Sequence, residues 1–141
     1  MIRFILFCQL TSFLFGQKIF EEFEKDRNNQ YHYKETYRFD TVTDDGSYTV
    51  LMDKIEGDIT VSTHFGAGAE LTITRKIRAV TEKKAKRLVK NANILVFHLA
   101  DDQLIQIRSE KRIQYKRDVT TQFELKLPTN INLNLETSGG D

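Results

Sequence analysis

Apolar and polar residues alternate along most of the chain after residue 34. In the clearest stretch, 119–127, a valine, a phenylalanine and two leucines alternate with polar residues, and Pro128 ends the pattern. A similar alternation over 71–78 predicts a strand with one buried and one wet face. Shorter patterns of the same kind predict strands near 34–39, 47–52, 59–62, 94–99, 104–108 and 131–136.

One segment has helical periodicity instead. Within 81–93, apolar residues fall at i, i+3, i+4 and i+7, namely Ala85, Leu88, Val89 and Ala92. Thr81 is placed to cap the first turn, and Lys90 lies near the negative end of the helix dipole. The chain is therefore predicted to be mainly β, with about eight strands and one helix, folded as a layered antiparallel β-sandwich or a β-helix-like solenoid.

Glycine and aspartate mark the corners between these strands. The Gly57-Asp58 pair precedes an alternating strand, because glycine tolerates positive φ and aspartate bonds its own local backbone. Asp44-Asp45-Gly46, Gly66-Ala67-Gly68 and Asp101-Asp102 predict further turns. The last residues, Thr137 to Asp141, repeat the Gly-Asp corner in shorter form.

The N-terminus has the three-part pattern of a secretory signal peptide. Arg3 precedes an apolar run from Phe4 to Phe15, and Gly16 supplies a small residue before a polar stretch. The run is shorter than the roughly 20 residues that span a bilayer. We therefore expect residues 1–16 to direct export to the periplasm, cell surface or exterior; a buried N-terminal strand or helix is the alternative.

Residues 17–33 are charged and weakly periodic. Ile19, Phe20 and Phe23 would share one face of a short helix, so we expect a semi-ordered lead-in whose aromatic residues dock on the domain. The 141 residues fit a single domain, which we place at 34–141.

Composition excludes several classes of function. The formal net charge is +1, and removal of residues 1–16 would remove Arg3 and leave none. Balanced charge and export argue against a nucleic-acid partner and leave at most peripheral membrane contact. The single cysteine, Cys8, lies in the signal, so the exported domain would be stabilised by packing without disulfides.

Catalytic, cofactor and metal motifs are weak. His32, His64 and His98 have no short ligand spacing between them, and the Gly66-Ala67-Gly68 turn precedes a strand where a nucleotide-binding loop needs a helix. The paired aspartates at 44–45 and 101–102 lack a calcium-loop pattern and favour turns. We therefore predict no catalytic residue, cofactor or metal ligand.

The strongest charge feature is a basic run in which Glu82 is the only acid, formed by Arg75, Lys76, Arg78, Lys83, Lys84, Lys86, Arg87 and Lys90. One interpretation is the solvated face of a strand and a helix. The other is a patch for an anionic envelope glycan or lipid, formed by all of these residues except Lys84, because clustered lysine and arginine attract phosphates and other anions.

With these features in place, the chain resembles a bacterial family of adhesin-like β-domains whose function is poorly defined. Four motifs carry the resemblance in order: Ile55 to Val61, the strand and helix at 71–93, Phe123-Glu124-Leu125-Lys126-Leu127-Pro128, and the leucine-rich strand that runs into Thr137 to Asp141. In that family the Ser-Gly-Gly-Asp element opens further strands. The resemblance therefore implies a cell-envelope β-domain that corresponds to the family's N-terminal part.

We accordingly expect a non-enzymatic, exported β-scaffold or adhesin-like interaction module whose partner is an envelope polymer, a glycan or another protein. The main alternative is a binding module for an anionic glycan or lipid through the basic patch. A glycan hydrolase is a third hypothesis, and it would require two carboxylates that face each other across a cleft.

Overall fold

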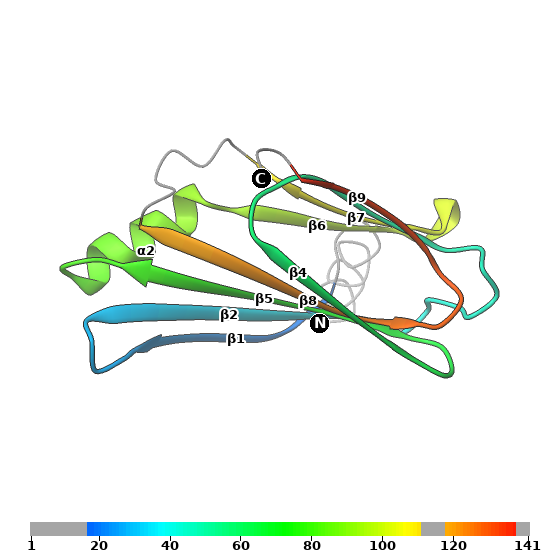
Figure 1. Cartoon of the computed structure of the whole chain (residues 1–141), viewed down its shortest axis with the longest axis horizontal. Helices are drawn as coiled ribbons and strands as arrows, with labels where there is room; N and C mark the ends of the chain where they lie inside the picture. The colour runs from blue at the N-terminus through cyan, green and yellow to red at the C-terminus, as the bar shows by residue number, and fades with distance from the viewer. Residues whose placement is uncertain (1–16, 111–117, 138–141) are drawn as a thin grey trace, which may run out of the picture.

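The computed structural model describes residues 17–110 and 118–137, which form two β-sheets and one α-helix (Figure 1). The elements, in chain order, are β1 (Gln17–Lys25), β2 (Gln30–Phe39), β3 (Thr49–Ile55), β4 (Asp58–His64), β5 (Ala69–Arg78), α2 (Glu82–Asn91), β6 (Ile94–Leu99), a 3₁₀ turn η1 (Ala100–Asp102), β7 (Leu104–Ser109), β8 (Val119–Pro128) and β9 (Asn132–Thr137). The protein is therefore mainly β, as its alternating pattern predicts.

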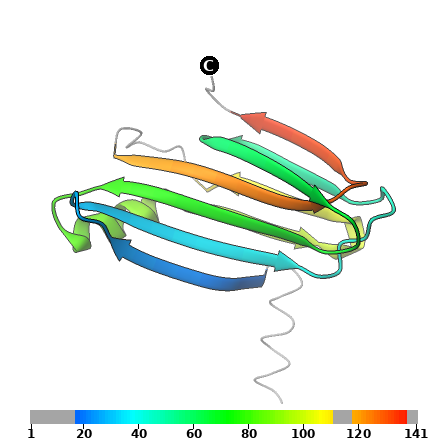
Figure 2. The ribbon, with the colours of Figure 1, turned by 60° about the horizontal axis from the view of Figure 1, so that its bottom comes forward.

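The larger sheet has five strands in the order β1-β2-β5-β8-β4, and Figure 2 shows them side by side. The smaller sheet has the order β6-β7-β3-β9. Both sheets are mixed, because β4 runs parallel to β8 and β3 runs parallel to both β7 and β9. The predicted antiparallel arrangement of the layers was therefore wrong, and the two sheets of the described residues do not form the β-helix-like solenoid that was the alternative.

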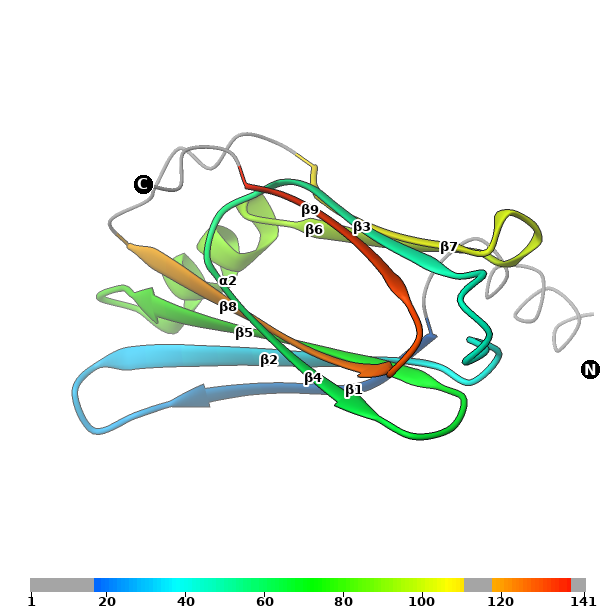
Figure 3. The ribbon, with the colours of Figure 1, turned by 45° about the vertical axis from the view of Figure 1, so that its right-hand side comes forward.

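Crossings between the sheets explain the parallel pairs, since parallel neighbours need a connection that leaves the sheet and returns. The chain passes from β3 in the smaller sheet to β4 in the larger one, and from β8 back to β9 (Figure 3). The first crossing turns at Gly57, whose φ is +136°, a conformation open to glycine. The predicted Gly-Asp corner is thus a passage between layers.

The main hydrophobic core fills the space between the two sheets. The larger sheet contributes Phe39, Ile73 and Phe123, and the smaller sheet contributes Met52 and Ile107, among others, all of them buried. These residues occupy alternate strand positions, so the alternation in the sequence corresponds to the inner and outer faces of each sheet.

A second hydrophobic cluster lies where helix α2 covers the inner face of the larger sheet. Ala85 and Leu88 of the helix pack with Tyr31, Ile77 and Val119 of β2, β5 and β8. The inner face is therefore covered by the smaller sheet along one part of its strands and by α2 along the other. The candidate site lies at the seam where the smaller sheet and α2 meet.

Helix α2 agrees closely with the predicted 81–93 segment. Thr81 is its N-cap, and its hydroxyl accepts a hydrogen bond from the Lys84 amide at 3.2 Å. By contrast, the short helix expected around Ile19 and Phe23 is wrong, because residues 17–25 form β1, antiparallel to β2. Pairing with an available strand edge outweighs the weak helical pattern of this segment.

Three features of the sequence lie outside the described residues: the signal-like segment 1–16, the segment 111–117, which contains two lysines and two arginines, and the second Gly-Asp motif at 138–141. Among the residues with described structure, no helix has the length and apolar character needed to cross a bilayer.

Candidate functional site

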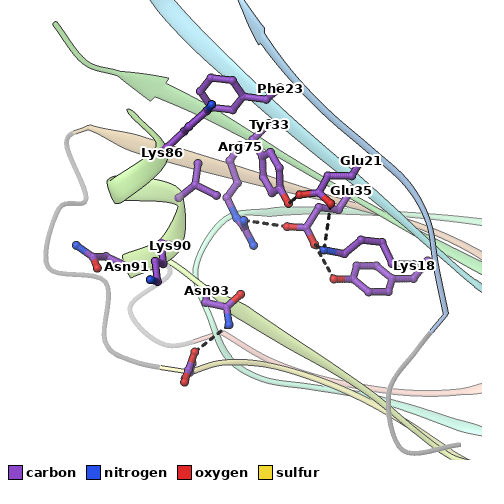
Figure 4. A pocket seen from close by; sticks show the side chains of 13 residues that line it. Lys18, Glu21, Phe23, Tyr33, Glu35, Arg75, Lys86, Lys90, Asn91 and Asn93 are labelled. Atoms are coloured by element: carbon purple, nitrogen blue, oxygen red, sulfur yellow. Dashed lines mark hydrogen bonds and ion pairs between the residues drawn. The ribbon is translucent and has the colours of Figure 1, made fainter. Parts of the chain in front are cut away.

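A pocket of about 600 Å³ opens at the seam between helix α2 and the sheets (Figure 4). This volume falls within the range of small-molecule sites, roughly 300–1,000 Å³. Strands β1, β2 and β5 supply one wall, and α2 with the residues that follow it supplies the other. The lining consists of Lys18, Glu21, Phe23, Tyr33, Glu35, Tyr37, Arg75, Lys86, Val89, Lys90, Asn91, Asn93 and Glu110.

Two charged residues of the pocket point inward because of strand alternation. The inner positions of β2 carry tyrosine, phenylalanine and Glu35, and those of β5 carry alanine, leucine, isoleucine and Arg75. In the antiparallel register, Arg75 lies opposite Tyr33 and Glu35 lies opposite Ile73. The two charges are therefore diagonal neighbours, on the stretch of sheet between the two hydrophobic clusters.

Arg75 and Glu35 form a buried ion pair. The side chains are 1% and 5% exposed, and Nη1 of Arg75 donates to Oε1 of Glu35 at 3.0 Å. The other oxygen of Glu35 accepts from the Tyr37 hydroxyl at 2.6 Å and lies 3.4 Å from Nζ of Lys18. Both carboxylate oxygens of Glu35 are thus occupied by donors, as burial of a charge requires.

Arg75 is less completely satisfied. Its Nε and Nη2 atoms are buried and have no hydrogen-bond partner in the described part of the chain. A buried donor without a partner is costly, and more so when it carries charge. The free nitrogens of this guanidinium are the feature of the pocket that most directly indicates a ligand or an ordered water.

The two tyrosines beside the ion pair remain neutral hydrogen-bond donors. Burial raises the pKa of the Tyr37 hydroxyl far above its usual range, and its hydrogen bond to Glu35 adds to the effect. Burial also raises the pKa of Tyr33, which donates to Oε1 of Glu21. The aromatic ring of Tyr33 lies 5.5 Å from the Arg75 guanidinium, a cation–π arrangement that holds the arginine in place.

The mouth of the pocket carries lysines and amides. Nζ of Lys86 lies 2.9 Å from Glu82 and 5.4 Å from the centre of the Phe23 ring. Lys90, one helical turn further on, is exposed and has no ion-pair partner among residues 17–110 and 118–137. Asn93 donates to Glu110 at 2.8 Å, which ties the end of the helical segment to the end of β7.

The structure divides the predicted basic patch into three groups. Arg75, Lys86 and Lys90 line the pocket. Lys76 and Arg78 are exposed on the opposite face of β5, since they occupy the alternate positions of that strand. Lys83 and Arg87 lie on another side of α2, around a smaller pocket that also includes Lys84 and Asp118. The residues of the predicted patch therefore lie on different sides of β5 and α2, and Arg75 is buried.

Most of the pocket was not predicted from the sequence. Lys18, Glu35, Tyr33 and Tyr37 were not singled out, nor were the two asparagines at the mouth. A signal was present: Glu35 and Arg75 each occupy an apolar-face position in an alternating strand. Opposite charges on the inner faces of two strands predict a buried pair only once those strands are known to be neighbours.

The three histidines lie in separate environments. His32 pairs with Asp26 at 2.9 Å, His64 is near the Phe65 carbonyl, and His98 packs between Tyr48 and Phe39. The described residues contain no group of three histidine, cysteine, aspartate or glutamate side chains placed to hold a metal ion.

The aspartate pairs lie in turns, and Asp44 also accepts a hydrogen bond from the backbone amide of the distant Asn130 at 2.8 Å. Asp45 accepts from the Ser47 and Thr43 hydroxyls and the Ser47 amide, and these bonds lower its pKa to about 2. Asp101 and Asp102 lie in η1. Both pairs thus lie outside the pocket.

Comparisons of the chain with protein-family models, with curated proteins and with solved structures give no match. The adhesin-like resemblance therefore stays a prediction, and the pocket is interpreted from its own chemistry.

Proposed function

We propose that this protein is an exported, non-enzymatic binding module of the cell envelope, which holds an anionic group of its ligand on Arg75. One observation carries the proposal: Arg75 lines the pocket, and Nε and Nη2 of its buried guanidinium have no hydrogen-bond partner in the described part of the chain. Guanidinium groups bind carboxylates, phosphates and sulfates by paired, charge-assisted hydrogen bonds. Of the two interpretations of the basic run, the unpaired guanidinium favours the binding patch. The patch then consists of Arg75, Lys86 and Lys90 only.

The surroundings of Arg75 support this role. Glu35 and the Tyr33 ring fix the guanidinium from two sides, so little side-chain entropy would be lost when an anion binds. Lys90 at the mouth is exposed and adds positive charge for steering a negative ligand towards the pocket.

The binding proposal is tested by NMR on the side chain of Arg75. The Nε–H resonance of a buried arginine is observable, and we expect it to shift saturably as sodium acetate, phosphate or sulfate is titrated at constant ionic strength. Arg75→Lys identifies the resonance by its disappearance, and it removes the paired N–H donors of the guanidinium. A resonance that none of the three anions moves would refute the proposal.

Matched lysine variants separate the pocket from general surface charge. The double variant Lys86→Glu, Lys90→Glu reverses the charge on the pocket side of α2. The double variant Lys83→Glu, Arg87→Glu reverses an equal charge on the other side of the same helix. We expect the first pair to abolish retention on anionic envelope material and the second to have a small effect. Equal losses would mean that retention depends on net charge rather than on the pocket.

A second candidate function is the adhesin-like scaffold that the family resemblance implies, built as a two-layer β-sandwich. It is favoured by a polar hollow of about 290 Å³ on the larger sheet, lined by Asp58, Thr60, Thr72, Thr74, Gln122, Phe123 and Glu124. Such a surface suits polar, water-mediated contact with a protein or glycan. Replacing Thr72 and Gln122 by lysine should reduce adhesion to envelope preparations if this face is used, while binding of anions at Arg75 stays unchanged.

A glycan hydrolase is the weakest of the three hypotheses. The most buried carboxylate of the pocket, Glu35, already accepts hydrogen bonds from Arg75 and Tyr37 and lies beside Lys18. Its oxygens are therefore engaged in holding the arginine, which supports binding rather than proton transfer to a substrate.

A further inference from the structure

The geometry points to the chemical class of the ligand: we propose that the group bound at Arg75 is a monocarboxylate, carried by a sugar acid or a short fatty acid. This inference rests on the proposed binding function and makes it more specific. Three features of the pocket support it, namely the shape of the free edge of Arg75, the local charge balance and the nature of the walls.

The two free nitrogens lie on the same edge of the guanidinium. Nη1 is used by Glu35, so Nε and Nη2 remain, and their N–H bonds point side by side. This arrangement matches the two coplanar oxygens of a carboxylate, which accept one hydrogen bond each. A ligand group of this kind would satisfy both orphan donors at once.

The charge balance favours a single negative charge. The side chains that line the pocket include four cations, Lys18, Arg75, Lys86 and Lys90, and three carboxylates, Glu21, Glu35 and Glu110. The excess of one positive charge is matched by a monoanion. A phosphate monoester close to a dianion would place its second charge near Glu35, where repulsion is strong because solvent is excluded. The side chains of Lys18 and Glu21 are 38% and 55% exposed, so water screens these two charges more than it screens the buried Arg75 and Glu35.

The walls suit an organic body behind the carboxylate. Phe23 and Val89 provide apolar surface in the lining, and Asn91 and Asn93 provide amides. Apolar contacts suit either the hydrocarbon of a short acid or the C–H face of a sugar ring, and the amides suit hydroxyl groups. Carboxylates from both sources fit these walls, so the experiment includes one of each.

The test is calorimetric titration of the full chain with glucuronate, octanoate and methyl phosphate at neutral pH and constant salt, followed by NMR of the Arg75 Nε–H. We expect glucuronate or octanoate to bind saturably and to move this resonance. Arg75→Lys should weaken that binding about ten- to hundredfold, the size expected for loss of a charge-assisted hydrogen-bond pair. The tighter carboxylate identifies the source as glycan or lipid.

Folding-neutral variants keep the test decisive if Arg75→Lys is unstable. Lys90 is exposed at the pocket. Its replacement, Lys90→Gln, should weaken carboxylate binding about two- to fivefold through lost electrostatic attraction. Lys83→Gln, on the other side of α2, should leave it unchanged. Equal affinities of these two variants, or binding that does not move the Arg75 resonance, would overturn the inference.

The outcomes separate this inference from the proposed function. If methyl phosphate binds with movement of the Arg75 resonance and neither carboxylate does, the monocarboxylate inference fails while the anion-binding function stands. If no anion moves the resonance, both fail.

Discussion

Gly57 and Thr121 are in such close contact that the corner between the two sheets has no room for a side chain. A Cβ atom placed on Gly57 would lie 2.2 Å from the Thr121 carbonyl oxygen, and the φ of this glycine is +136°. Space and backbone conformation therefore require glycine independently. The crossing from β3 to β4 depends on a residue that the sequence pattern marks only as a turn.

Gly57→Ala is expected to destabilise the protein by about 3 kcal/mol or more, because strain at positive φ adds to a clash with backbone that cannot move away easily. Gly66→Ala is the matched control. Gly66 also has positive φ, +97°, but no atom lies within 4 Å of the added methyl group. Urea unfolding should show a loss of only about 1 kcal/mol for this control, and equal losses would show that packing at Thr121 contributes nothing.

The N-cap of helix α2 gives a smaller effect. Thr81→Ala removes the hydroxyl that accepts from the Lys84 amide, and such losses typically cost about 1 kcal/mol. Thr81→Ser keeps the acceptor and should have near wild-type stability in urea unfolding. An alanine variant as stable as the serine variant would mean that water replaces the cap without cost.

The buried ion pair predicts non-additive stability effects. Arg75→Met leaves Glu35 buried with only Tyr37 and Lys18 as donors and should cost about 3 kcal/mol. The double variant Arg75→Met, Glu35→Leu removes both charges and should recover much of that loss, because a well-packed apolar pair replaces an expensive charged one. Denaturant unfolding of both single variants and the double variant measures the coupling, and simple additivity of the losses would contradict this account.

His98 predicts a dependence of stability on pH. Burial lowers its pKa below the ordinary value of 6.5, since the charged imidazolium is disfavoured between Tyr48 and Phe39. The unfolded chain therefore takes up a proton near pH 6.5 while the folded chain does not. The stability from this site is complete above pH 6.5 and is lost as the pH falls towards the folded-state pKa.

The measurement is the free energy of unfolding between pH 7.5 and 5. The contribution of one proton has a slope of at most about 1.4 kcal/mol per pH unit. His98→Gln should remove this slope, whereas His64→Gln, at the end of β4, should keep it. The effect is separate from that of Asp45, whose pKa is lowered from 3.8 to about 2. Its stabilisation is complete above pH 3.8 and is lost as the pH falls towards 2. A wild-type slope in the His98 variant would contradict the assignment.

The elements were predicted well where the alternating pattern is long. Strand β8 ends at Pro128, and α2 begins after the Thr81 cap, both as the sequence indicates. Pairing could not be predicted in the same way. Whether β9 lies antiparallel or parallel to β3 depends on the crossings at Gly57 and after Pro128, and these are tertiary events with little local signal.

The site was less predictable than the fold for the same reason. Counting charges along 75–90 grouped Arg75 with surface lysines, although alternation places it among the buried residues of β5. Its partner Glu35 lies 40 positions earlier in the chain, and only the β2–β5 pairing brings the two together. Local pattern therefore predicts which face a charge occupies, but its partner depends on the register between strands.

The parallel pairing of β3 with β9 has a consequence for how the chain folds as it is synthesised. Val50 lies beside Leu133, so more than half of the sequence separates two neighbours in one sheet. When β3 leaves the ribosome neither of its partners, β7 and β9, has been made, and one of its edges stays open until residues 132–137 emerge. A nascent chain of this topology needs protection from other open strands for most of its synthesis, and completion of the smaller sheet is expected to be the slow step of folding.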